Sequence, residues 1–176
     1  MPEDPKVYGM APGPRRPRIA PVSNPSPGPL VRSAGPDDVG ALVRFNTSMA
    51  LETEDHALAP DVLQAGIQAV LSDGARGFYL VAEVAGEVAG ALMVTPEWSD
   101  WRAGWFWWIQ SVYVLPEQRR RGVYRALYAE VQARGQAAGD VRGIRLYVER
   151  ENDPAQETYR ALGMSHSRYD LFEVDL

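Results

Sequence analysis

Apolar side chains recur along the chain with two different spacings, which predict an alternation of strands and helices. Runs rich in apolar and β-branched residues predict strands over residues 30–33, 78–84, 88–95, 105–115, 144–148 and 169–174. Apolar residues spaced three and four apart predict helices over about 37–50, 60–73, 122–138 and 154–162. The polar stretch 51–59 is expected to form a loop, and Ala85-Gly86-Glu87 a hairpin turn. This order predicts a mixed α/β domain.

The first 29 residues differ from the rest of the chain. They hold nine of its fourteen prolines and almost no periodic apolar residues. Such a segment buries too little surface to offset the entropy lost on ordering. We therefore expect a disordered, proline-rich tail over residues 1–29, followed by one domain over residues 30–176. No apolar run suits a signal peptide or a membrane span, so a cytoplasmic protein without membrane contact is expected.

Composition removes several kinds of chemistry. The chain has no cysteine and only two histidines, His56 and His166, which argues against a metal site, a disulfide framework and a cysteine nucleophile. Residues 31–176 carry 14 basic and 21 acidic side chains, a net charge of −7. Nucleic-acid binders usually present a basic face, so no nucleic-acid partner is expected. The acidic field favours a cationic small molecule instead.

Residues 111–128, SVYVLPEQRRRGVYRALY, combine an apolar strand, an arginine-rich turn and the start of a helix. The first N–H groups of a helix lack partners within it, and the helix dipole adds partial positive charge there, so main-chain donors can bind a phosphate. Gly122 allows the backbone to come close. Arg119, Arg120 and Arg121 stay charged and can bind phosphate oxygens in a bidentate fashion. The segment therefore predicts a turn that binds pyrophosphate.

A second segment, residues 146–164, reads LYVERENDPAQETYRALGM. Apolar strand residues come first. Asn152-Asp153-Pro154 then forms a typical helix start, and Tyr159 lies about one and a half turns into the helix.

In this order the two segments resemble the GNAT superfamily of acetyl-coenzyme A dependent N-acetyltransferases. That family's phosphate pattern is Arg or Gln, two residues, Gly, one residue, then Gly or Ala; it falls on residues 119–124, with Tyr124 at the last position. The later segment matches the family at Asn152, Ala155, Tyr159, Leu162, Gly163 and Met164. The resemblance covers residues 31–176. It implies the GNAT fold, a mixed and mostly antiparallel sheet flanked by helices, with splayed strands that form the acetyl-coenzyme A cleft.

The resemblance implies acetyl-coenzyme A as the acetyl donor, with no metal. Backbone groups of the strand end before the turn would pair with the pantetheine arm and polarise the thioester carbonyl, and a donor of this kind is typically worth about 2.7 to 4 kcal/mol. Tyr159 is expected to act as general acid to the thiolate; a tyrosine that packs the core is the alternative. Asn152 would bond the pantetheine arm, cap the helix, or both. The expected coenzyme-binding residues are Val112, Tyr113, Val114, Arg119, Arg120, Arg121, Gly122, Val123, Tyr124, Arg125, Asn152 and Tyr159.

The base that deprotonates the amine is less well defined. Alkylamines have a pKa of about 10 to 10.5, so a base or a water chain must remove a proton. Some GNAT enzymes place a glutamate where this chain has Gln110 and Ser111. Glu52, Glu54 or Asp55, acting through water, are the remaining candidates. The helix–loop layout looks like that of polyamine acetyltransferases, in which acids of this loop hold the ammonium groups of the substrate; a solvated acidic loop is the alternative.

The five tryptophans all fall between residues 98 and 108. Trp98 and Trp101 could form an aromatic wall for an amine, a homodimer contact, or part of the core. The expected substrate-binding residues are Glu52, Glu54, Asp55, Trp101 and Gln110.

The resulting hypothesis is a monomeric or homodimeric enzyme that acetylates a primary amine of a small cationic acceptor, by direct attack in a ternary complex. One alternative is a protein N-terminal or lysine acetyltransferase. Another is a GNAT-like module that binds acyl-coenzyme A without turnover, for which the missing strand glutamate is the only sequence hint.

Overall fold

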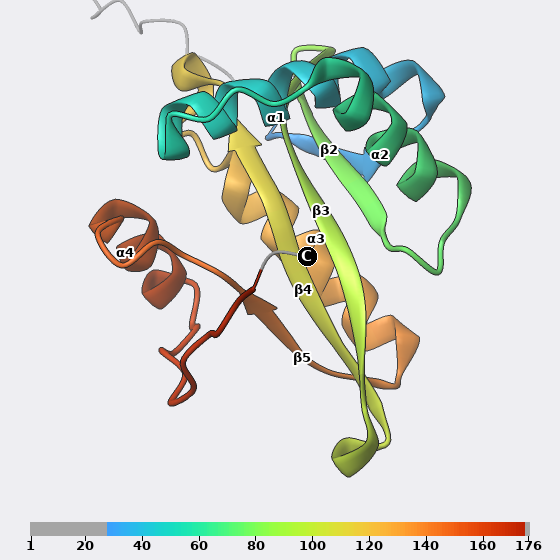
Figure 1. The fold of residues 1–176 in the computed structure, drawn as a ribbon, viewed down its shortest axis with the longest axis vertical. Helices are drawn as coiled ribbons and strands as arrows, with labels where there is room; N and C mark the ends of the chain where they lie inside the picture. Colours follow the sequence, from blue (N-terminus) through green and yellow to red (C-terminus); the bar gives the residue numbers. More distant parts are fainter. Residues whose placement is uncertain (1–27, 175–176) are drawn as a thin grey trace, which may run out of the picture.

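The computed structural model describes residues 28–174, apart from the side chain of Glu54. The proposed tail therefore lies almost entirely outside the described residues. One sheet runs in the order β1-β2-β3-β4-β5 (Figure 1). Neighbouring strands are antiparallel except for β4 and β5, which are parallel. The strands are β1 (Leu30–Ser33), β2 (Phe78–Val84), β3 (Glu87–Ser99), β4 (Gly104–Val114) and β5 (Val141–Leu146).

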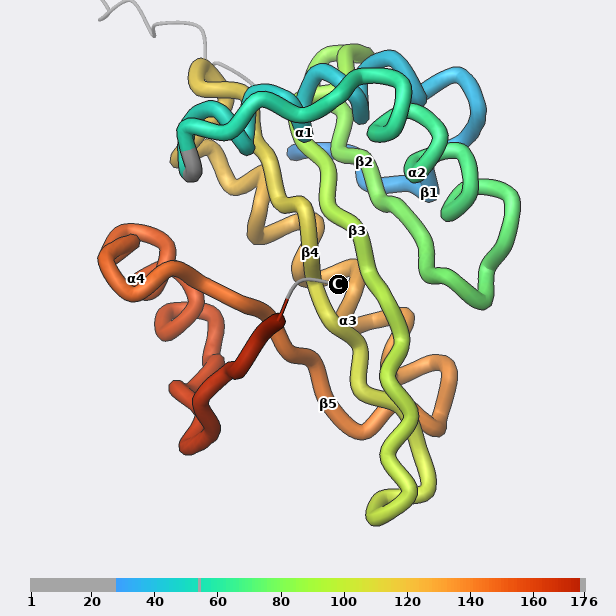
Figure 2. Tube along the Cα trace, in the orientation of Figure 1, coloured from blue at the N-terminus to red at the C-terminus, as the bar shows by residue number. Residues whose placement is uncertain are grey.

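Helices cover both faces of this sheet. The helices are α1 (Val39–Glu54), α2 (Pro60–Ser72), α3 (Val123–Ala138) and α4 (Asp153–Ala161). Helices α1 and α2 lie across one face, α3 covers the other, and α4 stands beside β5 (Figure 2). The predicted mixed, mostly antiparallel sheet with flanking helices is confirmed. No helix within residues 28–174 is long and apolar enough to cross a membrane.

Two apolar layers hold the helices to the sheet. Leu80, Leu92 and Val94 of the sheet pack against Leu127 and Val131 of α3, and all five are fully buried. On the other face, Leu42 and Phe45 of α1 and Ile67 of α2 pack on Tyr79 and Val81 of β2. Burying one such aliphatic side chain stabilises the fold by about 1.5 to 3 kcal/mol. The alternation of these residues along each strand places them on opposite faces.

Three predicted boundaries of helices and strands were wrong. Helix ends and strand ends depend on capping and on pairing between strands, which the local spacing of apolar residues does not show. Residues 51–54 belong to α1 rather than to a loop, since the helix ends only where Asp55 adopts a left-handed φ of 48° and donates its N–H to Ala50. Strand β3 continues to Ser99, because β4 pairs with it along that length. Strand β5 spans 141–146 instead of 144–148, because its register with β4 starts at Trp105 and Val141.

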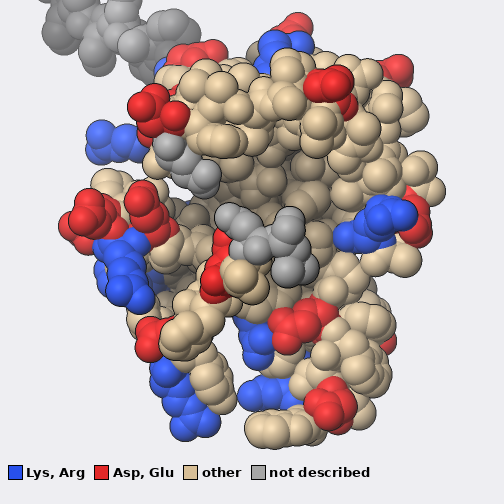
Figure 3. Space-filling model, viewed as in Figure 1, with Lys and Arg blue, Asp and Glu red and all other residues tan. Residues whose placement is uncertain are grey.

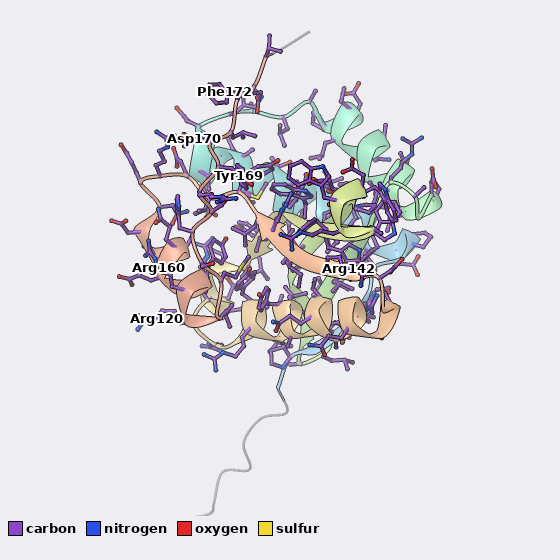
Figure 4. All side chains as sticks on the ribbon, turned by 90° about the horizontal axis from the view of Figure 1, so that it is seen from below. Arg120, Arg142, Arg160, Tyr169, Asp170 and Phe172 are labelled. Carbon is purple, nitrogen blue, oxygen red and sulfur yellow. The ribbon has the colours of Figure 1, made fainter. Side chains whose placement is uncertain are left out.

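The predicted final strand over residues 169–174 is absent. A strand needs a partner, and this segment pairs with neither outer strand, β1 or β5, of the described sheet. It runs instead on the α1–α2 side of the sheet, where Figure 4 labels Tyr169, Asp170 and Phe172. Its apolar side chains are exposed, Phe172 to 93%. The prediction was wrong because apolar residues indicate a strand only where a neighbouring strand is there to pair with it.

Asp38 ties β1 to the start of α1. Its buried carboxylate accepts hydrogen bonds from Nη1 and Nη2 of Arg32 at 2.7 and 2.9 Å, and from the N–H of Gly35 at 2.7 Å. The hydrogen bonds from Arg32 hold the pKa of Asp38 below its usual value. A carboxylate with a lowered pKa in the folded state stabilises the fold above its unfolded pKa, and this stabilisation is lost as pH falls through the folded pKa.

We expect Asp38→Ala to lower the free energy of unfolding by about 2 to 3 kcal/mol at neutral pH, since it removes charge-assisted hydrogen bonds from a buried site. Urea unfolding at about pH 7 and about pH 2.5 measures the effect, which should shrink in acid. The exposed neighbour offers a matched control, Asp37→Ala, with an expected change under about 0.5 kcal/mol. An Asp38→Ala loss of equal size at both pH values would contradict this account.

Candidate active site

Strands β4 and β5 separate near the middle of β4. Their last paired residues are Ile109 and Leu146, so β4 continues from Gln110 to Val114 without β5 beside it. Within this stretch Ser111 has a positive φ of 51°, and the register with β3 shifts between Ala91 and Met93. Such a bulge turns backbone groups away from regular pairing and is common beside active sites. On the side of β5, this stretch of β4 therefore has backbone donors and acceptors that no strand pairs with, and an extended ligand could bind there.

The predicted strand-end residues 112–114 lie on this free stretch. The bulge at Ser111 was missed by sequence reasoning. A serine carries no sequence signal for a left-handed φ, which is uncommon for any residue other than glycine.

Helix α3 begins at the arginine turn with free N–H groups. Its N-cap, Gly122, has φ 84° and offers no capping side chain. The first intrahelical bond there joins the N–H of Ala126 to the carbonyl of Gly122 at 2.9 Å, which leaves the preceding amides for a ligand. A Cβ at Gly122 would meet nothing within 4 Å, so the glycine serves the left-handed backbone conformation. Val123 is buried to 1% exposure and can contribute only main-chain groups.

The arginines of the turn divide into two kinds. Arg120, Arg121 and Arg125 are exposed, and within the described residues no ion pair involves them. Arg119 instead donates from Nη2 to Glu52 at 2.5 Å and from Nε to the carbonyl of Val114 at 3.0 Å. Three cations are thus available to an anionic ligand, while the fourth is directed toward the end of α1.

Helix α4 places Tyr159 beside the start of α3. The ring of Tyr159 meets that of Tyr124 edge to face, with centroids 5.7 Å apart. Burial raises the pKa of Tyr159, so its hydroxyl keeps its proton to a higher pH than a free tyrosine. Asn152 accepts a hydrogen bond from the N–H of Ala155 at 3.2 Å and is the N-cap of α4. Figure 4 shows Arg120 and Arg160 at the same end of α3, consistent with this juxtaposition.

Glu52, in the last turn of α1, reaches the arginine turn with its side chain. The hydroxyl of Tyr113 donates to Glu52 Oε1 at 2.7 Å, and Arg119 pairs with Oε2. The hydrogen bonds from Tyr113 and Arg119 lower the pKa of Glu52, which makes this carboxylate a weaker base than expected for a proton acceptor. Asp55 is exposed and ends α1, and the side chain of Glu54 lies outside the described residues.

Gln110 faces the α1–α2 side of the sheet, opposite to the neighbouring core residue Ile109. Its Nε2 donates to Thr95 Oγ1 at 2.7 Å. Trp108 shares this face, and its ring stacks on that of Tyr147 with centroids 4.5 Å apart. Sequence reasoning missed this aromatic pair, because Tyr147 follows a strand whose pairing with β4 the sequence does not specify.

Two further charged residues share this part of the face. Glu97 accepts a hydrogen bond from the indole N–H of Trp108 and pairs with Arg145 at 3.1 Å. Trp101, expected to contribute to an aromatic wall, is 93% exposed in the short turn Asp100–Arg102 that joins β3 to β4. Figure 3 shows acidic and basic side chains interspersed over this view of the surface.

Comparison with known proteins decides the family. The model of the acetyltransferase (GNAT) family matches residues 42–164. The chain belongs to the GNAT acetyltransferases. The predicted family is thus confirmed, and the protein is an acyltransferase. A comparison of this acetyltransferase with curated proteins found no match.

Solved structures agree with this assignment. A possible acetyltransferase from Clostridium difficile 630 is 40% identical, with a TM-score of 0.79 over 85% of this chain and 99% of that one. The fold is also shared with AAC(6')-Iy, solved with the bisubstrate analogue CoA-S-monomethyl-acetylneamine (19% identity, 85% and 99% coverage, TM-score 0.68). A predicted acetyltransferase from Clostridium acetobutylicum, solved with acetyl-CoA, is 14% identical (84% and 96% coverage, TM-score 0.68).

Proposed function

We propose that this GNAT acetyltransferase transfers an acetyl group from acetyl-coenzyme A to a primary amine of a small cationic acceptor. The observation that carries the proposal is the combination of three features at one place. The free stretch of β4, the uncapped start of α3 with its exposed arginines, and Tyr159 on α4 lie around the point where β4 and β5 separate.

The residues present suit the coenzyme. Amides at the start of α3 and the guanidinium groups of Arg120, Arg121 and Arg125 would hold the pyrophosphate. Backbone groups of β4 between Ser111 and Val114 would pair with the pantetheine arm and polarise the thioester carbonyl. Acetyl-coenzyme A supplies the activated acetyl group when bound. The chain's own residues supply position and proton transfer.

The proton balance assigns a role to Tyr159. The ammonium group of the acceptor first loses one proton to give a neutral amine. The amine nitrogen then bonds to the carbonyl carbon, the carbon–sulfur bond breaks, the nitrogen loses a second proton, and one proton must reach the sulfur. Tyr159 donates the proton to the sulfur and takes one back from water. Its raised pKa keeps the hydroxyl protonated over the working pH range. The protons of the nitrogen leave through water, because Gln110 and Ser111 are not bases and the hydrogen bonds from Tyr113 and Arg119 lower the pKa of Glu52, which makes it a weak base.

The acceptor is proposed to bind on the α1–α2 side of the sheet, near Gln110. The stacked rings of Trp108 and Tyr147 offer an aromatic surface to a cation. The net charge of −7 over residues 31–176 attracts such a substrate. Glu54 and Asp55, at the end of α1, would hold a distant ammonium group, whereas Glu52 is already paired with Arg119.

A panel of amines assayed for thiol release from acetyl-coenzyme A tests this function. Polyvalent small amines should react faster than peptides with a free N-terminus or a lysine. With the best amine, a Glu54→Gln/Asp55→Asn double variant should raise the acceptor KM and leave the acetyl-coenzyme A KM unchanged. Glu52→Gln is the matched comparison and should change the acetyl-coenzyme A KM instead.

Peptides that outperform every small amine would replace this proposal by a protein acetyltransferase. Binding of coenzyme A without thiol release from any acceptor in the panel would favour the non-catalytic module.

A further inference from the structure

Tyr124 carries a buried hydroxyl that the fold itself does not use. Within residues 28–174, two buried side-chain atoms lack a hydrogen-bond partner, Tyr124 Oη and Gln118 Oε1. They flank the arginine turn, one just before it and one just after. Buried polar groups are nearly always hydrogen-bonded, and each exception calls for an explanation. Both exceptions therefore lie at the ends of the turn to which an anionic ligand is assigned under the proposed function.

The surroundings of Tyr124 are aromatic. Its ring meets Tyr159 at a centroid distance of 5.7 Å and stacks on Tyr128 at 6.2 Å. Burial raises the pKa of Tyr124 far above its ordinary value, and the neighbouring phenols of Tyr159 and Tyr128 raise it further. The hydroxyl is therefore a neutral O–H donor at any physiological pH, and a poor source of a transferred proton.

A phenylalanine at this position would fill the same space without burying an unpaired hydroxyl. The GNAT pattern has Gly or Ala here, so the ring is a feature of this chain and not of the pattern. An unpaired buried hydroxyl costs stability in the ligand-free protein. This loss of stability has an explanation if the hydroxyl donates a hydrogen bond to a ligand that binds beside Tyr159.

We propose that the Tyr124 hydroxyl donates a hydrogen bond to a carbonyl oxygen of the pantetheine arm of bound coenzyme A, and so contributes to binding rather than to proton transfer. This inference rests on the proposed function, in which the arm pairs with β4 and its sulfur lies beside Tyr159 of α4. Tyr124 would then bind the pantetheine arm, and Tyr159 would protonate the sulfur.

Calorimetry with Tyr124→Phe and coenzyme A tests the proposal. Loss of one neutral hydrogen bond should raise the Kd by about threefold to tenfold. Thermal unfolding of the ligand-free variant should show a Tm that is unchanged or raised, by up to about 4 °C, because an unpaired hydroxyl has been removed. Opposite signs in affinity and stability distinguish this role from ordinary packing, for which both would fall.

Two controls locate the effect. Tyr128→Phe removes the hydroxyl of the adjacent ring, one turn along α3, and should change the Kd by less than about twofold. Adenosine 3′,5′-bisphosphate, which lacks the pantetheine arm, should bind to Tyr124→Phe as it binds to the wild type. An equal weakening for this nucleotide would assign the effect to the start of α3 and overturn the arm contact.

Binding of coenzyme A by the wild type distinguishes failure of this inference from failure of the proposed function. If it binds coenzyme A and Tyr124→Phe binds with the same Kd, the inference on Tyr124 fails and the proposed function stands. If the wild type does not bind coenzyme A, the proposed function fails, and the inference with it.

Discussion

Replacing Tyr159 by phenylalanine should lower turnover by about 100- to 10,000-fold, the usual contribution of a positioned proton donor. The change removes one hydroxyl and leaves the aromatic ring against Tyr124, so coenzyme A affinity should change little. Because burial raises the pKa of Tyr159, the rate of the wild type should hold to a higher pH than a free phenol would allow.

Single-turnover measurements at saturating acetyl-coenzyme A test this result, because they exclude product release as the limiting step. Tyr128→Phe serves as the control and should retain the wild-type rate. If Tyr159→Phe also retains it, Tyr159 packs α4 and the sulfur takes its proton from water.

The second large effect concerns the arginine turn. Removing two cations with Arg120→Ala/Arg121→Ala should weaken coenzyme A binding by about 10- to 100-fold, since each charge-assisted hydrogen bond to a phosphate is worth about 1.5 to 3 kcal/mol and exposure to solvent reduces its effect. Both side chains are exposed, so circular dichroism should show an unchanged fold.

Calorimetry at two salt concentrations measures the effect, which should diminish at high salt as the charges are screened. Arg44→Ala/Arg76→Ala removes the same charge from α1 and from the turn after α2 and should leave affinity within about twofold. Equal weakening in the two double variants would show that only the overall charge matters, and the turn would lose its assignment.

Local sequence patterns predicted most of the helices and strands. Helix starts with proline or asparagine, such as Pro60 and Asn152, and the glycine turn before α3 are decided within a few residues, so the sequence located them well. The two family segments are equally local. The residues predicted from them, 112–114, 119–125 and Tyr159, lie within the range that the family model matches, and their roles stay predictions.

Contacts between distant segments could not be predicted. The pairing of Glu52 with Arg119 depends on where α1 ends relative to the turn, and α1 is a full turn longer than its apolar spacing indicates. The bulge at Ser111 follows from the register of β4 on β3. The meeting of Tyr124 with Tyr159 depends on how α4 sits beside α3. Each of these is set by tertiary packing, which overrides local preference.

The proposed function requires coenzyme A to bind at the free amides that begin α3. An amide-resolved NMR titration of the full chain with coenzyme A tests it most directly. We expect large shifts for the amides of residues 122–125 and Ser111, and none at the start of α2, whose first-turn amides are an internal control. Binding that leaves residues 122–125 unshifted, or shifts the start of α2 as strongly, would contradict this assignment.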